Sequence, residues 1–332
     1  MQLLFIGQII GVVSASALLL FLLARLWPRR GPGMRCQGYA VLITGCDSGF
    51  GHMLAVALDR RGFTVFAGCL QPEAAGAQSL TRLCTSRLRI LKLDVTSEQD
   101  VQLARKTVQD NLPEKGLWAV VNNAGISDWA EIEWSSSQDF QNMLNVNLMG
   151  GIRTSIALLP LVRVAKGRMV FVSSIFSFFT CLNMAAYSVS KRGLEAFADC
   201  LRVEMASFGV KVSIIQPGNF GQATDIVKVK TDEEIWARLD EERKHTFNRS
   251  YIELANQYFT SSCRSGSGSA APVVQAMVHA LTSARPRSRY LLVPPTELIL
   301  FRLLPLLPTA LTDAFFSLSS MYSTRRRLLY TQ

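Results

Sequence analysis

The sequence predicts a single α/β domain, built on a doubly wound parallel sheet and preceded by a transmembrane helix. Two observations predict the sheet. Six short apolar runs recur along the chain, and an amphipathic segment of helical length separates each from the next. Strands that are apolar throughout are typical of parallel sheets covered on both faces, and right-handed crossovers between them give a doubly wound sheet. The runs are 39–44, 63–68, 89–93, 117–121, 168–173 and 210–215, and the helical segments include 52–61, 97–111, 138–165 and 187–207.

The first 27 residues have the composition of a transmembrane anchor. Residues 3–24 carry no charge, and a helix of that length crosses a hydrocarbon core of about 30 Å. Arginines follow in a basic linker over residues 28–38, so the positive-inside rule places the rest of the chain in the cytosol. We expect the endoplasmic reticulum membrane, with a mitochondrial membrane as the alternative. The competing interpretation is a cleaved signal peptide, which normally has a basic start and a shorter apolar core.

A glycine-rich loop follows the first predicted strand and opens a helix. In this context glycines let backbone amides approach a pyrophosphate at a helix N-terminus. An ordinary tight turn is the simpler interpretation, but the position at the end of the first strand favours a nucleotide site. The cofactor-binding candidates in this loop are Thr44, Gly45, Asp47, Ser48, Gly49, Phe50 and Gly51.

The loops after the third and fourth strands extend the predicted nucleotide site. Asp94 and Val95 follow the third strand, where a short side chain can accept a hydrogen bond from an adenine amino group. Helix capping is the alternative role of Asp94. Asn123, Ala124 and Gly125 follow the fourth strand, where the chain can pass close to a ribose. Ligands of doubly wound sheets bind past the carboxyl ends of the strands, so all these residues belong to one edge.

Tyr187 and Lys191 form a candidate acid–base pair. They lie four residues apart at the start of a predicted helix, so their side chains share one helix face. A phenol is a weak base at its ordinary pKa of about 10. A neighbouring ammonium favours the phenolate, so we expect Lys191 to lower the pKa of Tyr187.

Together these motifs resemble the short-chain dehydrogenase/reductase family. T-G-x-x-x-G-x-G, N-N-A-G, a serine at the end of the fifth strand and Y-x-x-x-K occur in the family's order between about residues 39 and 220. Within the family, the sequence is similar to the branch of D-3-hydroxybutyrate, retinol and 17β/11β-hydroxysteroid (type 2) dehydrogenases. The resemblance implies a Rossmann-type fold, with a dehydrogenase domain over residues 39–293.

The resemblance also implies catalytic roles. Tyr187 would take the alcohol proton as hydride leaves for nicotinamide, and Lys191 would also hold the nicotinamide ribose. Ser174, thirteen residues before the tyrosine, would hold the substrate oxygen. Asn147, within a V-N-x-x-G pattern, would hold a water of the proton relay.

Two positions depart from the family pattern. Pro217 and Gly218 match the turn beside the nicotinamide, but glutamine stands four residues later where most relatives carry threonine. Either Gln222 or Thr224 would therefore meet the carboxamide. Ser177 stands where relatives usually carry glycine, three residues after the serine.

The expected cofactor is NAD rather than NADP. An NADP site needs a cation for the 2′-phosphate, placed in the glycine loop or just after the second strand. Here the loop carries Asp47, which would repel a phosphate, and Cys69-Leu70-Gln71 after the second strand offers no cation.

The expected substrate is a lipophilic alcohol. The loop 175–186 is almost entirely apolar and lacks a cation, whereas a small carboxylate substrate needs one. We therefore expect oxidation of a steroid or retinoid, with D-3-hydroxybutyrate as the alternative. A non-catalytic NAD-binding protein is the competing hypothesis of another class. The substrate candidates are Ser174, Phe176, Phe178 and Phe220.

The remaining segments are a lid and an apolar tail. Residues 220–262 are expected to form a substrate lid, and residues 294–332 a segment that packs on the domain or dips into a membrane surface. The net charge of +10 suits anionic lipid or a phosphate-bearing ligand, and no nucleic-acid motif accompanies it. The three histidines lack partners at metal-ligand spacing, so no metal site is expected. The resemblance also implies a homodimer or homotetramer, between which the sequence does not choose.

Overall fold

The structure is a computed structural model that describes residues 36–317, except 180, 225, 228 and 229, together with residue 325. The predicted anchor over residues 1–27 lies outside the described residues, as does most of the basic linker. Within the described part of the chain, no helix combines the length and apolar character needed to cross a membrane. The elements below belong to one compact unit, which contains residues 35–282 and 286–332.

Seven parallel strands form one sheet in the order β3-β2-β1-β4-β5-β6-β7. The order reverses between β1 and β4, which is the switch point where doubly wound sheets bind their ligands. The predicted doubly wound fold is therefore confirmed. The strands are β1 Ala40–Thr44, β2 Thr64–Cys69, β3 Leu88–Lys92, β4 Leu117–Asn122, β5 Arg168–Val172, β6 Lys211–Pro217 and β7 Arg289–Leu292.

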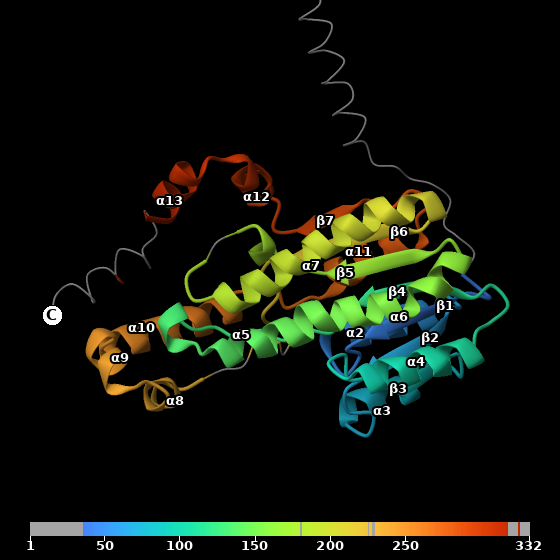
Figure 1. Ribbon diagram of the computed structural model, residues 1–332, viewed down its shortest axis with the longest axis horizontal. Coiled ribbons are helices and arrows are strands. Elements are labelled where there is room, and N and C mark those ends of the chain that lie inside the picture. Colours follow the sequence, from blue (N-terminus) through green and yellow to red (C-terminus); the bar gives the residue numbers. More distant parts are fainter. Residues whose placement is uncertain (1–35, 180, 225, 228–229, 318–324, 326–332) are drawn as a thin grey trace, which may run out of the picture. The chain divides into compact units, whose positions relative to one another are not determined.

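Helices cover both faces of this sheet (Figure 1). One face carries α4 Glu98–Asp110, α6 Gly150–Val164 and α7 Ala185–Glu204. The other carries α2 Gly49–Asp59, α3 Ala75–Leu83 and α11 Ala271–Thr282. Each strand-to-helix loop thus emerges at the carboxyl edge of the sheet.

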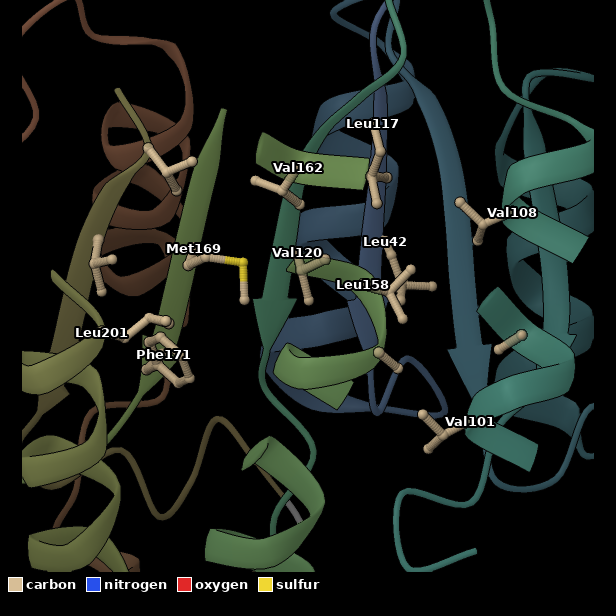
Figure 2. Packing of buried hydrophobic residues seen from close by; sticks show 14 of the residues in the cluster. Leu42, Val101, Val108, Leu117, Val120, Leu158, Val162, Met169, Phe171 and Leu201 are labelled. Carbon is tan, nitrogen blue, oxygen red and sulfur yellow. The ribbon is translucent and has the colours of Figure 1, made fainter. Parts of the chain in front are cut away.

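The main core lies between the sheet and the first of these layers. Figure 2 shows Leu42, Val120 and Met169 of the strands facing Leu158 and Val162 of α6, and all five side chains are fully buried. Burying a side chain of this kind contributes about 1.5–3 kcal/mol each. This rigid layer fixes the ends of the strands, from which the candidate site is built.

The predicted helix 138–165 is interrupted. The chain forms α5 Ser137–Leu144, then a π-helical turn Asn145–Met149, then α6. Single π-turns of this kind are frequent at functional sites, because the extra residue re-aims a side chain. The apolar periodicity predicts one uninterrupted helix and gives no sign of the turn, which contains the candidate Asn147.

The predicted lid is mostly helical. Its helices are α8 Asp232–Ala237, α9 Glu241–Thr246 and α10 Arg249–Arg264, and they lie near the N-terminal end of α7 (Figure 1). The apolar tail forms α12 Leu298–Leu303 and α13 Thr309–Ser317. Phe301 of α12 is buried and contacts the rings of Phe178 and Phe179, at centroid distances of 6.5 and 5.2 Å.

Candidate active site

The ends of β1 and β4 are joined through one threonine. Thr44 Oγ1 accepts hydrogen bonds from the amides of Asn123 and Ala124, at 3.0 and 2.9 Å. Gly45 has a φ of +70°, and a Cβ added there would lie 2.8 Å from Cα of Ala124. A Cβ at Gly51 would lie 2.2 Å from the carbonyl oxygen of Gly45. Both positions require glycine, so the candidate cofactor residues of the two loops form one close-packed cradle.

Asp47 closes this cradle toward β2. Its carboxylate accepts hydrogen bonds from the amides of Leu70 and Gln71, both at 2.9 Å. The negative charge predicted in the loop therefore lies over the end of the second strand. Ser48 precedes α2 as its N-cap residue, so the loop ends at a helix N-terminus.

Lys92, at the end of β3, is a basic residue that the sequence argument missed. Its ammonium donates to the carbonyl oxygen of Leu70 at 2.8 Å and lies 3.7 Å from Asp100. In the sequence, a cation for a 2′-phosphate is expected in the glycine loop or just after the second strand, and Lys92 is in neither segment. Because β3 neighbours β2, the end of the third strand supplies a cation to the same place.

Ser97, rather than Asp94, is the N-cap residue of α4, so Asp94 does not take the helix-capping role that the sequence left open. Its Oδ1 accepts hydrogen bonds from the amide and the hydroxyl of Thr96, at 2.8 and 2.7 Å. Val95 packs against the helix that follows the π-turn, where a Cβ on Gly150 would lie 2.6 Å from Cγ2 of Val95. The loop after β3 is thus a tight turn held against α6.

Lys191 and Asn147 meet at Gly125 of the N-N-A-G loop, and Tyr187 lies beside Lys191. Lys191 Nζ donates to the carbonyl oxygen of Val172 at 2.9 Å and lies 5.6 Å from the centroid of the Tyr187 ring. A Cβ on Gly125 would lie 3.4 Å from Lys191 Nζ and 3.2 Å from Asn147 Oδ1. All three side chains are at least nine-tenths buried. The structure therefore brings together residues that the sequence separates by 44 positions.

Asn147 is locked in place by the π-turn. Its Oδ1 accepts from the amide of Ile126 at 2.8 Å, and its Nδ2 donates to the carbonyl oxygen of Ile126 at 2.9 Å. Nδ2 also lies 3.0 Å from Oγ of Ser190. These contacts use both hydrogens of Nδ2 and one of the two lone pairs of Oδ1, and they fix the loop after β4 against α7.

Ser174 begins a short 3-10 turn, Ile175–Ser177, after β5. Its hydroxyl accepts from the amide of Phe176 at 3.3 Å, and its hydrogen bond to the phenol lowers the pKa of Tyr187. Burial is the larger effect and raises the pKa of Tyr187 to about 12. The predicted lowering by Lys191 is therefore wrong for this structure, because loss of solvent outweighs the neighbouring groups.

Lys191 shows the opposite response to the same burial. Burial lowers the pKa of Lys191 to about 8, and the nearby carboxylate of Glu195 raises it. A buried ammonium is disfavoured relative to the neutral amine, so the two members of the pair respond in opposite directions.

The predicted substrate phenylalanines separate into three places. Phe176 lies beside Tyr187, with ring centroids 6.1 Å apart. Phe178 contacts α12 through Phe301, and Phe220 packs edge-on against Phe50 of the glycine loop at 5.9 Å. Only Phe176 faces the candidate acid–base pair directly.

The larger wall of this site comes from aromatic residues that the sequence argument missed. Trp129 stacks on Phe259 of α10 at a centroid distance of 4.6 Å, and Trp134 packs against Phe247 and Tyr251. These side chains form one buried cluster with Tyr187, which we call the aromatic compartment. Two tryptophans shortly after N-N-A-G, Trp129 and Trp134, could have indicated an aromatic cluster near the candidate site. Its members are Trp129, Trp134, Met143, Met184, Tyr187, Ile235, Leu239, Phe247, Tyr251, Ile252, Ala255 and Phe259.

The Pro217–Gly218 turn ends β6. The amide of Gly218 donates to the carbonyl oxygen of Leu292 at 2.8 Å, which ties the turn to β7. A Cβ on Gly49 would lie 3.4 Å from Cγ2 of Thr224, so Thr224 sits over the glycine loop. Thr224 thus lies beside a candidate cofactor residue, whereas Gln222 lies beside Gly268, where an added Cβ would lie 3.3 Å from Oε1 of Gln222.

An acid–base pair beside a glycine-rich strand end, at the switch point of a doubly wound sheet, is the arrangement of a nucleotide-dependent oxidoreductase. Sequence comparison specifies the family. Residues 39–235 match the family model described as short chain dehydrogenase, and the chain belongs to that family of oxidoreductases.

Similar proteins act on different alcohols. D-beta-hydroxybutyrate dehydrogenase, mitochondrial, of Mus musculus is 42% identical over 262 residues, which are 76% of each chain. Retinol dehydrogenase 7 of Mus musculus is 38% identical over 309 residues, covering 91% of this chain and 95% of the relative. 17-beta-hydroxysteroid dehydrogenase type 6 of Homo sapiens is 40% identical over 260 residues, covering 76% and 80%.

Solved structures agree on the fold. A short-chain dehydrogenase from Streptomyces avermitilis superposes with a TM-score of 0.68 at 23% identity, covering 89% of this chain and all of that one. A short chain dehydrogenase/reductase from Burkholderia phymatum, solved in complex with NAD, gives a TM-score of 0.66 at 21% identity and covers 81% and 94%.

Proposed function

We propose that the protein oxidises the hydroxyl group of a steroid or retinoid to a carbonyl, with NAD as the hydride acceptor. The observation that carries this proposal is that Lys191 and Asn147 meet at Gly125, with Lys191 Nζ 5.6 Å from the ring centroid of Tyr187, a member of the aromatic compartment. The acid–base pair and the apolar surface for the substrate thus meet at the carboxyl edge of the sheet.

In this proposal each of four residues has a separate task. Tyr187 accepts the proton of the substrate hydroxyl, and Ser174 holds the substrate oxygen against the phenol. Lys191 keeps a positive charge beside Tyr187 and binds the nicotinamide ribose. Asn147 positions a water that carries the proton onward. The nicotinamide of NAD, when bound, supplies the hydride acceptor.

The cradle around β1 fits such a dinucleotide. Gly45 and Gly51 let the loop pack directly on Ala124 and on itself, and the loop ends at the N-terminus of α2, whose N-cap Ser48 makes no side-chain cap hydrogen bond. Backbone amides at such a helix N-terminus suit a pyrophosphate. Asp47 places a negative charge at the end of β2, which supports NAD over NADP. The positive charge of Lys92 would favour the 2′-phosphate of NADP. However, its ammonium already donates to the carbonyl oxygen of Leu70 and lies 3.7 Å from Asp100.

The charges of the lid support a lipophilic substrate. Lys230 is paired with Asp128 at 2.5 Å and donates to the carbonyl oxygen of Trp129 at 3.0 Å. Arg238 is paired with Asp139 at 3.2 Å. A carboxylate substrate would have to compete with Asp128 or Asp139 for one of these cations. D-3-hydroxybutyrate remains the second candidate, because the hydroxybutyrate dehydrogenase of Mus musculus is 42% identical.

The tail supports delivery of the substrate from a lipid surface. Four apolar side chains of the tail expose more than half of their surface, whereas Phe301 between them packs on Phe178 and Phe179. An exposed patch of this kind marks an interaction surface. We propose that it rests on the membrane into which the predicted anchor inserts. The exposed residues are Ile299, Leu303, Leu306 and Leu311.

The test is NADH formation by membranes that carry the full chain. Estradiol, testosterone, a corticosteroid, retinol and D-3-hydroxybutyrate are supplied separately with NAD. We expect NADH from a steroid or retinol and none from the Tyr187→Phe variant. NADH from D-3-hydroxybutyrate alone would replace the substrate proposal with its alternative.

A further inference from the structure

Glu195 is a buried carboxylate that the proposed chemistry does not use. It lies on α7, one turn after Lys191, and is 8% exposed. Its Oε1 lies 2.6 Å from Oγ of Ser177, and Nε2 of Gln216 donates to Oε1 and Oε2 at 2.9 and 3.1 Å. Arg289 Nε lies 3.7 Å away. Burying a carboxylate is costly unless it is bonded in this way, so its presence calls for an explanation.

Glu195 and two of its partners belong to three separate parts of the candidate site. Ser177 closes the turn that Ser174 begins, and its hydroxyl oxygen also lies 2.7 Å from the carbonyl oxygen of Ser174. Gln216 directly precedes the Pro217–Gly218 turn at the end of β6. Glu195 itself shares a helix with Tyr187 and Lys191. One carboxylate therefore joins the serine turn, the acid–base helix and the turn after β6.

We propose that Glu195 is a positioning residue that holds the Ser174 turn and the Pro217–Gly218 turn in register with Tyr187 and Lys191. The proposal rests on the catalytic roles assigned above. It also explains Ser177, which stands where relatives usually carry glycine: glycine has no hydroxyl to bond Glu195.

Electrostatics give Glu195 a second effect at the same place. Its charge raises the pKa of Lys191, which burial lowers to about 8. The other charged or titratable groups at this point are Tyr187 and Arg192 on α7, with Arg192 donating to the carbonyl oxygen of Ser177 at 2.9 Å. On β7, Arg289 faces Glu195 and is paired with Asp199 at 2.5 Å. Removing the carboxylate would therefore deprotonate Lys191 at a lower pH.

The test compares Glu195→Gln with Asp199→Asn in the detergent-solubilised full chain. Asp199 lies one turn further along α7 and shares Arg289, but none of its hydrogen bonds reaches Ser177 or Gln216. Two quantities are measured against pH: the Kd of NAD by tryptophan fluorescence, and kcat for the alcohol found by the NADH screen.

We expect Glu195→Gln to lower kcat by about tenfold to a hundredfold, because small misplacements of reacting groups are costly. The pH above which NAD binding weakens should fall by about one unit. Glu195→Asp, which keeps the charge on a shorter side chain, should retain that pH dependence while losing kcat. In Asp199→Asn, both kcat and the Kd of NAD should stay within about twofold of the parent values, as is usual for surface substitutions.

Equal behaviour of Glu195→Gln and Asp199→Asn would overturn the proposal. If Glu195→Gln does not fold, Ser177→Ala decides, because it leaves the bonds between Glu195 and Gln216 intact. In Ser177→Ala, a lowered kcat with an unchanged Kd of NAD supports the proposal, and an unchanged kcat contradicts it. Full activity in Tyr187→Phe is a different result, since it would refute the proposed function itself.

Discussion

The cofactor side and the substrate side of the site are built by different means. On the cofactor side, around β1 and β4, backbone approaches backbone, and glycines set the spacing. On the substrate side, buried aromatic side chains from the segment after β4 and from the lid pack in one cluster with Tyr187. Close backbone approach restricts which residue can occupy a position, whereas an apolar wall accepts many residues of similar volume. The first kind of site leaves a motif of fixed spacing in the sequence, whereas the second leaves only single aromatic residues such as Trp129 and Trp134.

The largest expected effect on ligand binding is on the cofactor side. In Gly51→Ala, the added methyl group would lie 2.2 Å from the carbonyl oxygen of Gly45 and 2.6 Å from Nδ2 of Asn123. The loop must then shift, and we expect the Kd of NAD to rise by at least about a hundredfold. Isothermal titration of the full chain with NAD measures this. A Kd of NAD within a few-fold of the parent value would show that close backbone packing is not what defines the cofactor side.

A change on the substrate side should leave NAD binding intact. Trp129→Ala removes the ring that stacks on Phe259, so we expect KM for the alcohol to rise about tenfold at an unchanged Kd of NAD. Phe208→Ala, at an exposed aromatic residue after α7, is the control and should change neither quantity. A parallel loss of NAD binding in Trp129→Ala would show that the two sides are not separate.

The pH dependence of cofactor binding tests the point where the two sides meet. Burial lowers the pKa of Lys191 to about 8, so its ammonium is present below that pH and is lost as the pH rises through it. Since the ammonium is proposed to hold the nicotinamide ribose, the Kd of NAD should be constant below pH 8 and increase above it. A Kd that stays flat to pH 10 would contradict this role of Lys191.

The smallest expected effect concerns the choice between NAD and NADP. Asp47→Ser removes the charge at the end of β2, and we expect the preference for NAD to fall by about threefold to tenfold. Lys92→Met should weaken NADP binding and leave NAD binding unchanged. Both Kd values are measured for each variant. An unaltered ratio in Asp47→Ser would remove the electrostatic argument for NAD.

The same contrast explains how far the sequence predicts the molecule. The strands, their parallel arrangement and the glycine loop follow from local patterns, so the sequence predicts the sheet well. The π-turn at Asn147 leaves no trace in apolar periodicity, since a single extra residue shifts the pattern too little. Trp129 and Tyr251 lie more than 100 residues apart in the chain, so only tertiary packing shows that they share a compartment with Tyr187.

Two residue assignments show the limit in detail. Phe178 is next to the serine turn in sequence, yet the 3-10 geometry directs it to Phe301 of the tail. Lys92 lies 22 residues after Leu70, yet strand pairing brings its ammonium to the Leu70 carbonyl oxygen. In both cases, distance along the chain is a poor guide to distance in the fold. Neighbouring positions separate at a turn, and distant positions meet across a sheet.

The most direct test of the account is NADH formation by the parent chain and by Tyr187→Phe, each in membranes supplied with NAD and either retinol or estradiol. The account predicts NADH from at least one of these alcohols with the parent. It predicts a loss of at least about a thousandfold in the variant, at an unchanged Kd of NAD. Equal rates of NADH formation by the two proteins would contradict it.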